Sequence, residues 1–289
     1  MVTAQQSKVS LFLKQHEQWS AWAFFTVMSG LVMYCMGLRG MQLLHVPLLG
    51  IMLLYVLKIC AMYLRRSTAW ALTCLCFAIT PFYQAPAAEL CMCLQVVTLC
   101  HVLGWVRGRR QVFCQRHFVV LGLAAGLTLL LLPKAAVFYA PVALLMLWVN
   151  RRALVGAVAR ALAGGALPLA LYAGARDFMP VPAAVPCLPL WGVAGGVLLL
   201  LALAAMAVRK GRPERWPVAL LALVIAWGSG VWMTVSWPYF LPLAILALVG
   251  VALLLHKFCV HRRALYFLRA LGLLIPFVTL IAVLLYHSL

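Results

Sequence analysis

The carboxylates are the residues from which catalysis would first be expected, and this sequence of 289 residues holds four of them: Glu17, Glu89, Asp177 and Glu214. General acid–base chemistry usually uses two carboxylates or a carboxylate beside a histidine, and hard divalent cations take several oxygen ligands. The four acids fall in separate segments, with no Asp-x-Asp or Glu-x-x-His pattern. The spacing therefore predicts no metal site, and no phosphate-loop motif points to a nucleotide cofactor.

Glu89 and Asp177 are still the candidate catalytic residues, because the span assignment given below places both at the outer face of a membrane. Arg39, Lys134 and Arg176 map to the same rim as candidate binding residues. Arginines bind phosphate or pyrophosphate through two parallel hydrogen bonds, so such a rim suits the head group of a lipid-linked substrate. The alternative is that these are ordinary loop charges, including an exposed Arg176/Asp177 pair that adds little stability.

Two further candidate binding residues, Lys58 and Gln95, lie inside apolar segments. Ionisable residues within a membrane are functional-site hypotheses. However, Lys58 is about 10 Å from the nearest basic residue, Arg65, along a helix, so its stem can extend to the interface. A glutamine in a helical bundle most often makes an interhelical hydrogen bond. We therefore favour an extended side chain for Lys58, whereas the residue type alone assigns no role to Gln95.

The ten cysteines mostly lie in apolar runs. The pairs Cys74/Cys76 and Cys91/Cys93 are two residues apart, which places the thiols of a pair about 200° apart on a helix. We therefore expect buried apolar side chains rather than metal ligands or a set of disulfides.

The elements that position these residues are predicted by composition. Hydrophobic residues make up 67% of the chain and charged residues 9%, whereas soluble proteins carry about 25% charged residues. The net charge of +19 would suit nucleic-acid binding only on a solvated surface. Here the cations sit in short clusters between apolar runs, which is typical of cytoplasmic loops and excludes nucleic acid as a partner.

The sequence predicts an all-α fold, a polytopic bundle of about eleven spans of roughly 20 residues each. The bundle forms a single transmembrane domain over residues 1–289, with no separate soluble domain. The predicted spans are 20–38, 42–63, 67–83, 88–106, 117–133, 135–149, 157–175, 187–208, 216–236, 238–256 and 268–287.

Charge distribution predicts the orientation of these spans. With a cytoplasmic N-terminus, most Lys and Arg residues face the cytoplasm and only Arg39, Lys134 and Arg176 face out, as the positive-inside rule requires. The C-terminus is then outside. Residues 1–19 are predicted to form an amphipathic interfacial helix. Gly164-Gly165, in the seventh span, is interpreted as a helix-packing signal.

A stretch from Arg66 to Asp177 resembles an uncharacterised family of bacterial multi-pass inner-membrane proteins, a domain of unknown function. The likeness rests on Ile79-Thr80-Pro81-Phe82-Tyr83, the basic loop from Arg107 to Arg116, Trp148-Val149-Asn150-Arg151-Arg152 and Gly165-Ala166-Leu167-Pro168. The resemblance implies a location in the bacterial cytoplasmic membrane and no known activity.

Three function classes follow. The first is a non-catalytic accessory or scaffold subunit whose partners are the lipid bilayer and other membrane proteins. The second is a glycosyltransferase or polymerase acting on polyprenyl-linked glycans at the outer face, with Glu89 or Asp177 as base. The third is a transporter or flippase that uses Lys58, Gln95 and the glycine-rich helices. The absence of an acid–base pair and of large loops favours the first.

Overall fold

The computed structural model describes residues 2–38, 43, 46–79, 86–107, 115–132, 138–140, 142–143, 154–175, 241–242, 245–246, 248–253 and 262–288. Within these ranges the regular structure is helical, which confirms the all-α prediction. The longer helices are α1 (Val2–Cys35), α2 (Val46–Tyr63), α3 (Arg66–Ile79), α4 (Pro86–Arg107), α5 (Gln115–Leu131), α7 (Leu154–Ala175) and α11 (Arg262–Ser288).

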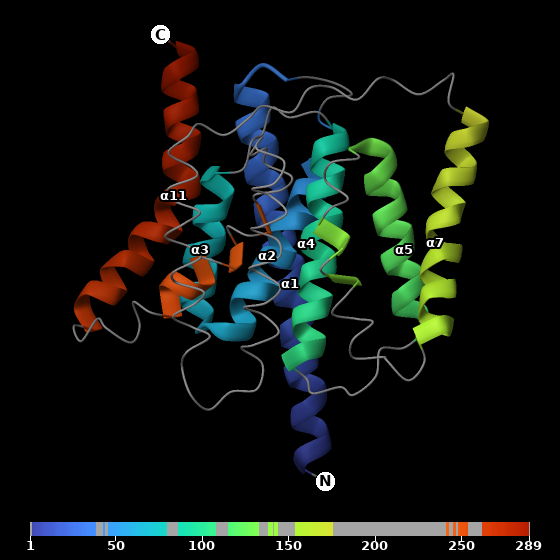
Figure 1. Ribbon diagram of the computed structural model, residues 1–289. Coiled ribbons are helices and arrows are strands. Elements are labelled where there is room, and N and C mark those ends of the chain that lie inside the picture. Colours follow the sequence, from blue (N-terminus) through green and yellow to red (C-terminus); the bar gives the residue numbers. More distant parts are fainter. Residues whose placement is uncertain are drawn as a thin grey trace.

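These helices stand side by side as a bundle, with α2 in contact with α1, α3 and α4 (Figure 1). The helices α1 to α4 thus form a central group. Beside it, α11 packs on α3 and α1, while α5 contacts α4 and packs most extensively against α7. The order across the described bundle is therefore α11, then the group α1–α4, then α5 and α7. The peripheral helices α7 and α11 lie at opposite sides.

Among the residues that the structure describes, three helices, α2, α7 and α11, are long and apolar enough to cross a membrane, through the segments Val46–Tyr63, Leu154–Leu171 and Arg269–Tyr286. The helix α3 has 14 residues and spans only about 21 Å, less than a hydrocarbon core of about 30 Å. It therefore falls short of the predicted span 67–83. The chain is accordingly a helical protein with membrane-spanning potential, and this structure does not support the larger predicted number of spans.

The first helix is continuous over 34 residues, which corresponds to about 51 Å. Figure 1 shows its N-terminal turns extending beyond the ends of the neighbouring helices. Residues 1–19 and the predicted span 20–38 are thus joined in one helix without a break after Trp19. That the N-terminal part lies on the membrane surface stays a prediction.

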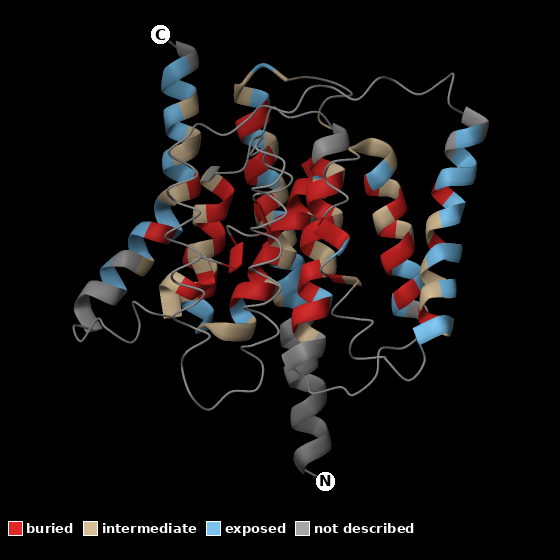
Figure 2. Ribbon diagram, viewed as in Figure 1, coloured by how far each residue is buried: buried red, intermediate tan, exposed pale blue. Residues whose placement is uncertain are grey.

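The buried core lies along α2 and α4, while α7 and α11 are mostly exposed (Figure 2). Half of the crossing segment of α2 is buried, against 17% for α7 and 11% for α11. An aromatic group closes the core beside α1: Phe25 stacks on Trp70 at 5.6 Å between ring centroids and lies 6.4 Å from Phe77. The central helices therefore form the rigid part of the bundle.

Glycines allow the closest approaches between helices. A methyl group at Gly122 of α5 would overlap the carbonyl oxygen of Ala161 in α7 and lie 2.7 Å from the carbonyl carbon. A methyl group at Gly272 of α11 would lie 2.7 Å from the Cβ atom of Ala71 in α3. Small residues at helix crossings bring backbones together and increase van der Waals contact. Gly164 also packs against α5, at Val119, which confirms the packing role predicted for Gly164-Gly165.

Each peripheral helix also carries an internal proline, Pro168 in α7 and Pro276 in α11. A proline donates no backbone hydrogen bond to the residue four positions earlier, and these residues are Gly164 and Gly272. Figure 1 shows α11 changing direction along its length. The proline accounts for this bend.

The C-terminus of α1 is closed by a glycine cap. Gly37 has φ of 82°, Leu38 N–H donates to the carbonyl of Met33 at 3.1 Å, and Gly37 N–H donates to the carbonyl of Tyr34 at 3.0 Å. These two bonds form a Schellman motif. The left-handed conformation at residue 37 is the reason glycine is favoured there.

We therefore expect Gly37→Ala to lower the free energy of unfolding by about 1 kcal/mol through backbone strain alone, because nothing lies within 4 Å of an added methyl group. Gly37→Asn should be milder, since asparagine tolerates this conformation. Thermal unfolding in detergent, followed with a thiol-reactive dye that reports the exposure of buried cysteines, checks both. An alanine variant as stable as the wild type would contradict the prediction.

Candidate functional site

Helix α4 carries two of the buried polar side chains of the described structure. This helix begins at Pro86, a residue well suited to the first helical position, and carries Glu89 in its first turn. Glu89 and Gln95 are both buried, with exposed fractions of 1% and 0%. Two of the predicted site residues are thus placed in the core of the bundle by the same helix.

The position of Glu89 differs from the expectation of a residue on the outer rim. Glu89 belongs to the first turn of α4, and its side chain is buried inside the bundle rather than exposed on a loop. The burial follows from α4 packing against α2 and α5, and a carboxylate in a first turn is favoured by the positive end of the helix dipole. A carboxylate in this environment is the strongest single indication of function in the described residues.

A second polar contact joins α5 to the short helical segment at residues 138–140. Thr128 donates a hydrogen bond from its hydroxyl to the Tyr139 hydroxyl at 3.3 Å, and both side chains are buried. Thr98 of α4 lies beside the same Tyr139 hydroxyl. The sequence analysis missed Thr128 and Tyr139; the available signal was a threonine in the apolar run 117–133 and a tyrosine after Phe138.

Lys58 is half-buried on α2, and its ammonium lies 4.5 Å from the centre of the Tyr55 ring. The Tyr55 ring is in turn 5.8 Å from the ring of His101 on α4. Tyr55 is one turn farther from the end of α2 than Lys58 is. The ammonium is therefore held against an aromatic ring. That it also extends toward the membrane interface stays a prediction.

Lys58 and Glu89 do not form one site. Lys58 faces α4 near Cys100 and His101, whereas Glu89 lies eleven residues before Cys100 on the same helix, which is about 16 Å. A carboxylate and an ammonium at that separation cannot act on one small group. Among the described candidates, Glu89 and Gln95 therefore both lie on α4. Lys58 lies on α2, beside the opposite end of α4 from Glu89.

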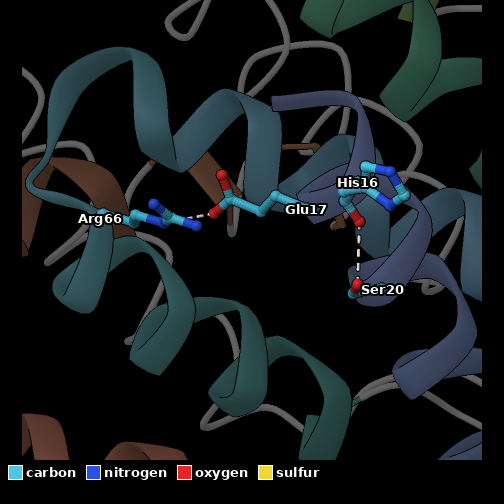
Figure 3. Close-up of polar contacts among 4 residues, drawn as sticks. All are labelled: His16, Glu17, Ser20 and Arg66. Carbon is cyan, nitrogen blue, oxygen red and sulfur yellow. Dashed lines mark hydrogen bonds and ion pairs between the residues drawn. The ribbon is translucent and has the colours of Figure 1, made fainter. Parts of the chain in front are cut away.

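An ion pair ties the N-terminal helix to α3. Glu17 of α1 pairs with Arg66, the first residue of α3, and Ser20 donates a hydrogen bond to the carbonyl oxygen of His16 at 2.8 Å (Figure 3). Arg66 is largely exposed, so the pair contributes at most about 1 kcal/mol. The pair joins the middle of α1 to the start of α3.

The described cysteines are free thiols, and all except Cys35 are buried: Cys60, Cys74, Cys76, Cys91, Cys93 and Cys100. This confirms that these cysteines are buried apolar side chains. Among the residues that the structure describes, no three His, Cys, Asp or Glu side chains lie close enough to hold a metal ion.

The predicted outer rim lies largely outside the described residues. Arg39, Lys134, Arg176 and Asp177 belong to the parts of the chain that the structure does not describe, so the predicted phosphate-binding rim stays a prediction. Comparisons with protein-family models, curated proteins and solved structures found no match to this chain.

Proposed function

We propose that this chain is a non-catalytic accessory or scaffold subunit of the bacterial cytoplasmic membrane, which binds a transmembrane helix of another subunit through the outer face of α7. The observation that carries the proposal is a stripe of exposed alanines on that helix: Ala159, Ala163, Ala166, Ala170 and Ala173. We refer to these residues as the alanine face. Their spacing keeps all five within about 40° of one direction around the helix axis.

The opposite side of α7 already has its partner. Ala161, Gly164 and Gly165 contact α5 through backbone atoms. The helix thus has small residues on two opposite faces, and one of them is used for close packing inside this chain. Small residues four positions apart are the typical composition of helix–helix interfaces in membranes.

The other peripheral helix, α11, has an exposed surface of different composition. The exposed stripe of α11 carries large apolar side chains, including Phe267, Leu274, Val278, Ile281 and Leu285. Acyl chains pack well against such residues, whereas a row of alanines flanked by leucines forms a shallow groove that suits another helix. The contrast supports a protein partner for α7 and lipid for α11.

The proposed topology keeps about eleven crossings, a cytoplasmic N-terminus and an external C-terminus. Two observations support it. The termini lie at opposite ends of the bundle in Figure 1, as an odd number of crossings requires. The contacts of Gly122 with Ala161 and of Gly126 with Pro168 advance in the same direction along both helices, so α5 and α7 are parallel and the chain must return between them, where 135–149 is the predicted span.

The family resemblance of residues 66–177 is part of the same proposal. It supports a bacterial inner-membrane location, and it covers α3, α4, α5 and α7. These helices hold Glu89, Gln95 and the alanine face. A subunit whose role is to bind a partner through the alanine face catalyses no reaction, so it needs no acid–base pair of its own.

A photo-reactive amino acid at position 166 tests the scaffold function. In native membranes we expect one discrete intermolecular adduct. A leucine at Ala163, one turn away, should reduce its yield about fivefold by filling the groove. The matched control is Ala282→Leu, which changes an exposed alanine on α11 and should leave the yield unchanged. Equal yields in the two variants, or a crosslink made only within the chain, would refute the proposal.

A second candidate function is favoured by the burial of Glu89. In the proposed topology its end of α4 faces outward, where a glycosyltransferase, polymerase or flippase acting on polyprenyl-linked glycans would hold its substrate. Glu89→Gln and Asp177→Asn should then abolish formation or export of lipid-linked glycan in the host, while Glu17→Gln should not. Normal glycan in the double variant would exclude this function.

A further inference from the structure

Basic residues from three helices meet at one end of the bundle. Lys58 lies five residues before the end of α2, His101 lies six residues before the end of α4, and His117 is the third residue of α5. Consecutive antiparallel helices place the end of α4 and the start of α5 on the same side. The three side chains therefore lie at a similar height in the bundle, within about 10 Å of the end where α2 and α4 finish and α5 begins. We call this end the N-terminal side, because the chain is proposed to start there.

The geometry of this group is set by an aromatic ring. The Lys58 ammonium lies 4.5 Å from the Tyr55 ring centre, and the His101 ring lies 5.8 Å from the same ring. His101 and His117 are exposed on the surface of the bundle, and Lys58 and Tyr55 are half-buried. We call these four residues the basic cluster.

The basic cluster has no described carboxylate beside it. The charged neighbours that act on His101 are His117 and Lys58, which are both basic. The described carboxylates lie elsewhere: Glu17 pairs with Arg66, and Glu89 is twelve residues before His101 on α4, about 18 Å away. An ammonium beside two imidazole N–H donors, with no described carboxylate next to them, can accept an anion as a common ligand.

We propose that the basic cluster binds the phosphate group of an anionic membrane lipid in the leaflet on the N-terminal side. The ammonium of Lys58 supplies a compact charge with three donors, and the two imidazoles supply ring N–H donors. Basic pockets between transmembrane helices commonly hold lipid head groups in this way. The exposed apolar side chains Val119 and Val120, next to His117, provide the surface on which an acyl chain lies.

A lysine that only reaches toward water would bind no particular lipid. Such a lysine extends along the helix to the interface, whereas Lys58 is turned back over Tyr55. The proposal therefore predicts that Lys58 and His101 act on the same bound group. Loss of either should weaken binding, and loss of both should weaken it by less than the sum of the two effects.

Native mass spectrometry of the full chain in detergent, titrated with phosphatidylglycerol or phosphatidylcholine, tests this. The wild type should retain phosphatidylglycerol preferentially. Lys58→Gln should weaken that binding about tenfold, in line with the loss of a charge-assisted hydrogen bond, and His101→Gln should weaken it severalfold. Lys58→Arg should restore most of the binding. The midpoint of thermal unfolding, measured for each variant, establishes that the fold is retained.

The matched control is Arg269→Gln. Arg269 lies over the ring of Tyr266, three residues earlier, at 5.5 Å, which is the same pairing as Lys58 with Tyr55 on another helix. Its loss should leave phosphatidylglycerol binding unchanged. An equal effect of Lys58→Gln and Arg269→Gln, or no effect of His101→Gln, would overturn the proposal. Displacement of the lipid by millimolar inorganic phosphate would assign the site to a soluble phosphate and would overturn the lipid assignment.

Discussion

Gly122→Ala is expected to separate α5 from α7 and to lower the free energy of unfolding by about 3 kcal/mol, which is typical of severe overpacking in a core. The added methyl group would overlap the carbonyl oxygen of Ala161 and approach its carbonyl carbon to 2.7 Å. These are backbone atoms, so rotation of a side chain cannot relieve the overlap. The two helices must move apart along the whole contact.

Thermal unfolding followed by the thiol-reactive dye is the measurement. The reporter thiols are the buried cysteines of the central helices, and the more accessible or undescribed Cys35, Cys114, Cys187 and Cys259 are replaced by serine in the parent protein. A loss of this size should lower the midpoint by about 6 °C or more. Because Cys91 lies beside Thr128 of α5, its labelling should also rise when α5 moves.

The control for this substitution is Gly156→Ala in α7. There the added methyl group meets only the end of the Arg160 side chain, with the nearest atom at 3.1 Å, and that side chain can turn away. Alanine in place of glycine inside a helix is intrinsically stabilising by about 1 kcal/mol. A Gly122→Ala protein that unfolds at the same temperature as Gly156→Ala would show that α5 and α7 are not in backbone contact.

Phe25→Ala is expected to have a similarly large effect, a loss of about 3 kcal/mol. Phe25 is fully buried and contacts Phe24, Trp70 and Phe77 through its ring. Removing it leaves a cavity at the junction of α1 and α3. In a membrane the destabilisation comes mainly from lost packing, since the surrounding lipid is also apolar.

The same dye assay gives the result, and Phe277→Ala provides the comparison. Phe277 belongs to the same aromatic group, with its ring 6.2 Å from that of Phe24, but it is 47% exposed. Its truncation leaves no closed cavity, so the effect should stay below about 1 kcal/mol. Equal destabilisation by the two substitutions would contradict the assignment of Phe25 to the core.

The helices were predictable from the sequence because apolar length is a local property. Each longer described helix coincides with a predicted apolar run, although α1 begins at Val2, well before residue 20. The contacts between helices were less predictable, since they depend on which faces meet. Gly122-x-x-x-Gly126 carried a readable packing signal that the analysis did not use, whereas its partner Ala161 could not be inferred.

The candidate site was predictable only in part. Glu89 and Gln95 were identified by residue type, but the burial of Glu89 depends on how α4 packs, which spacing along one chain does not specify. The turn of Lys58 toward Tyr55 and the approach of His101 from α4 likewise require two helices in register.

The prolines of the peripheral helices have a mechanical consequence. Pro168 and Pro276 each leave the carbonyl group four residues earlier without its helical donor, and in both helices that residue is the glycine at the contact with a neighbour. In each helix, the residue that packs against the neighbouring helix is thus also the residue whose carbonyl group lacks its helical hydrogen bond. The segments beyond these points can swing without breaking any further helical hydrogen bond, so the bundle can change its width at both flanks while α2 and α4 stay fixed.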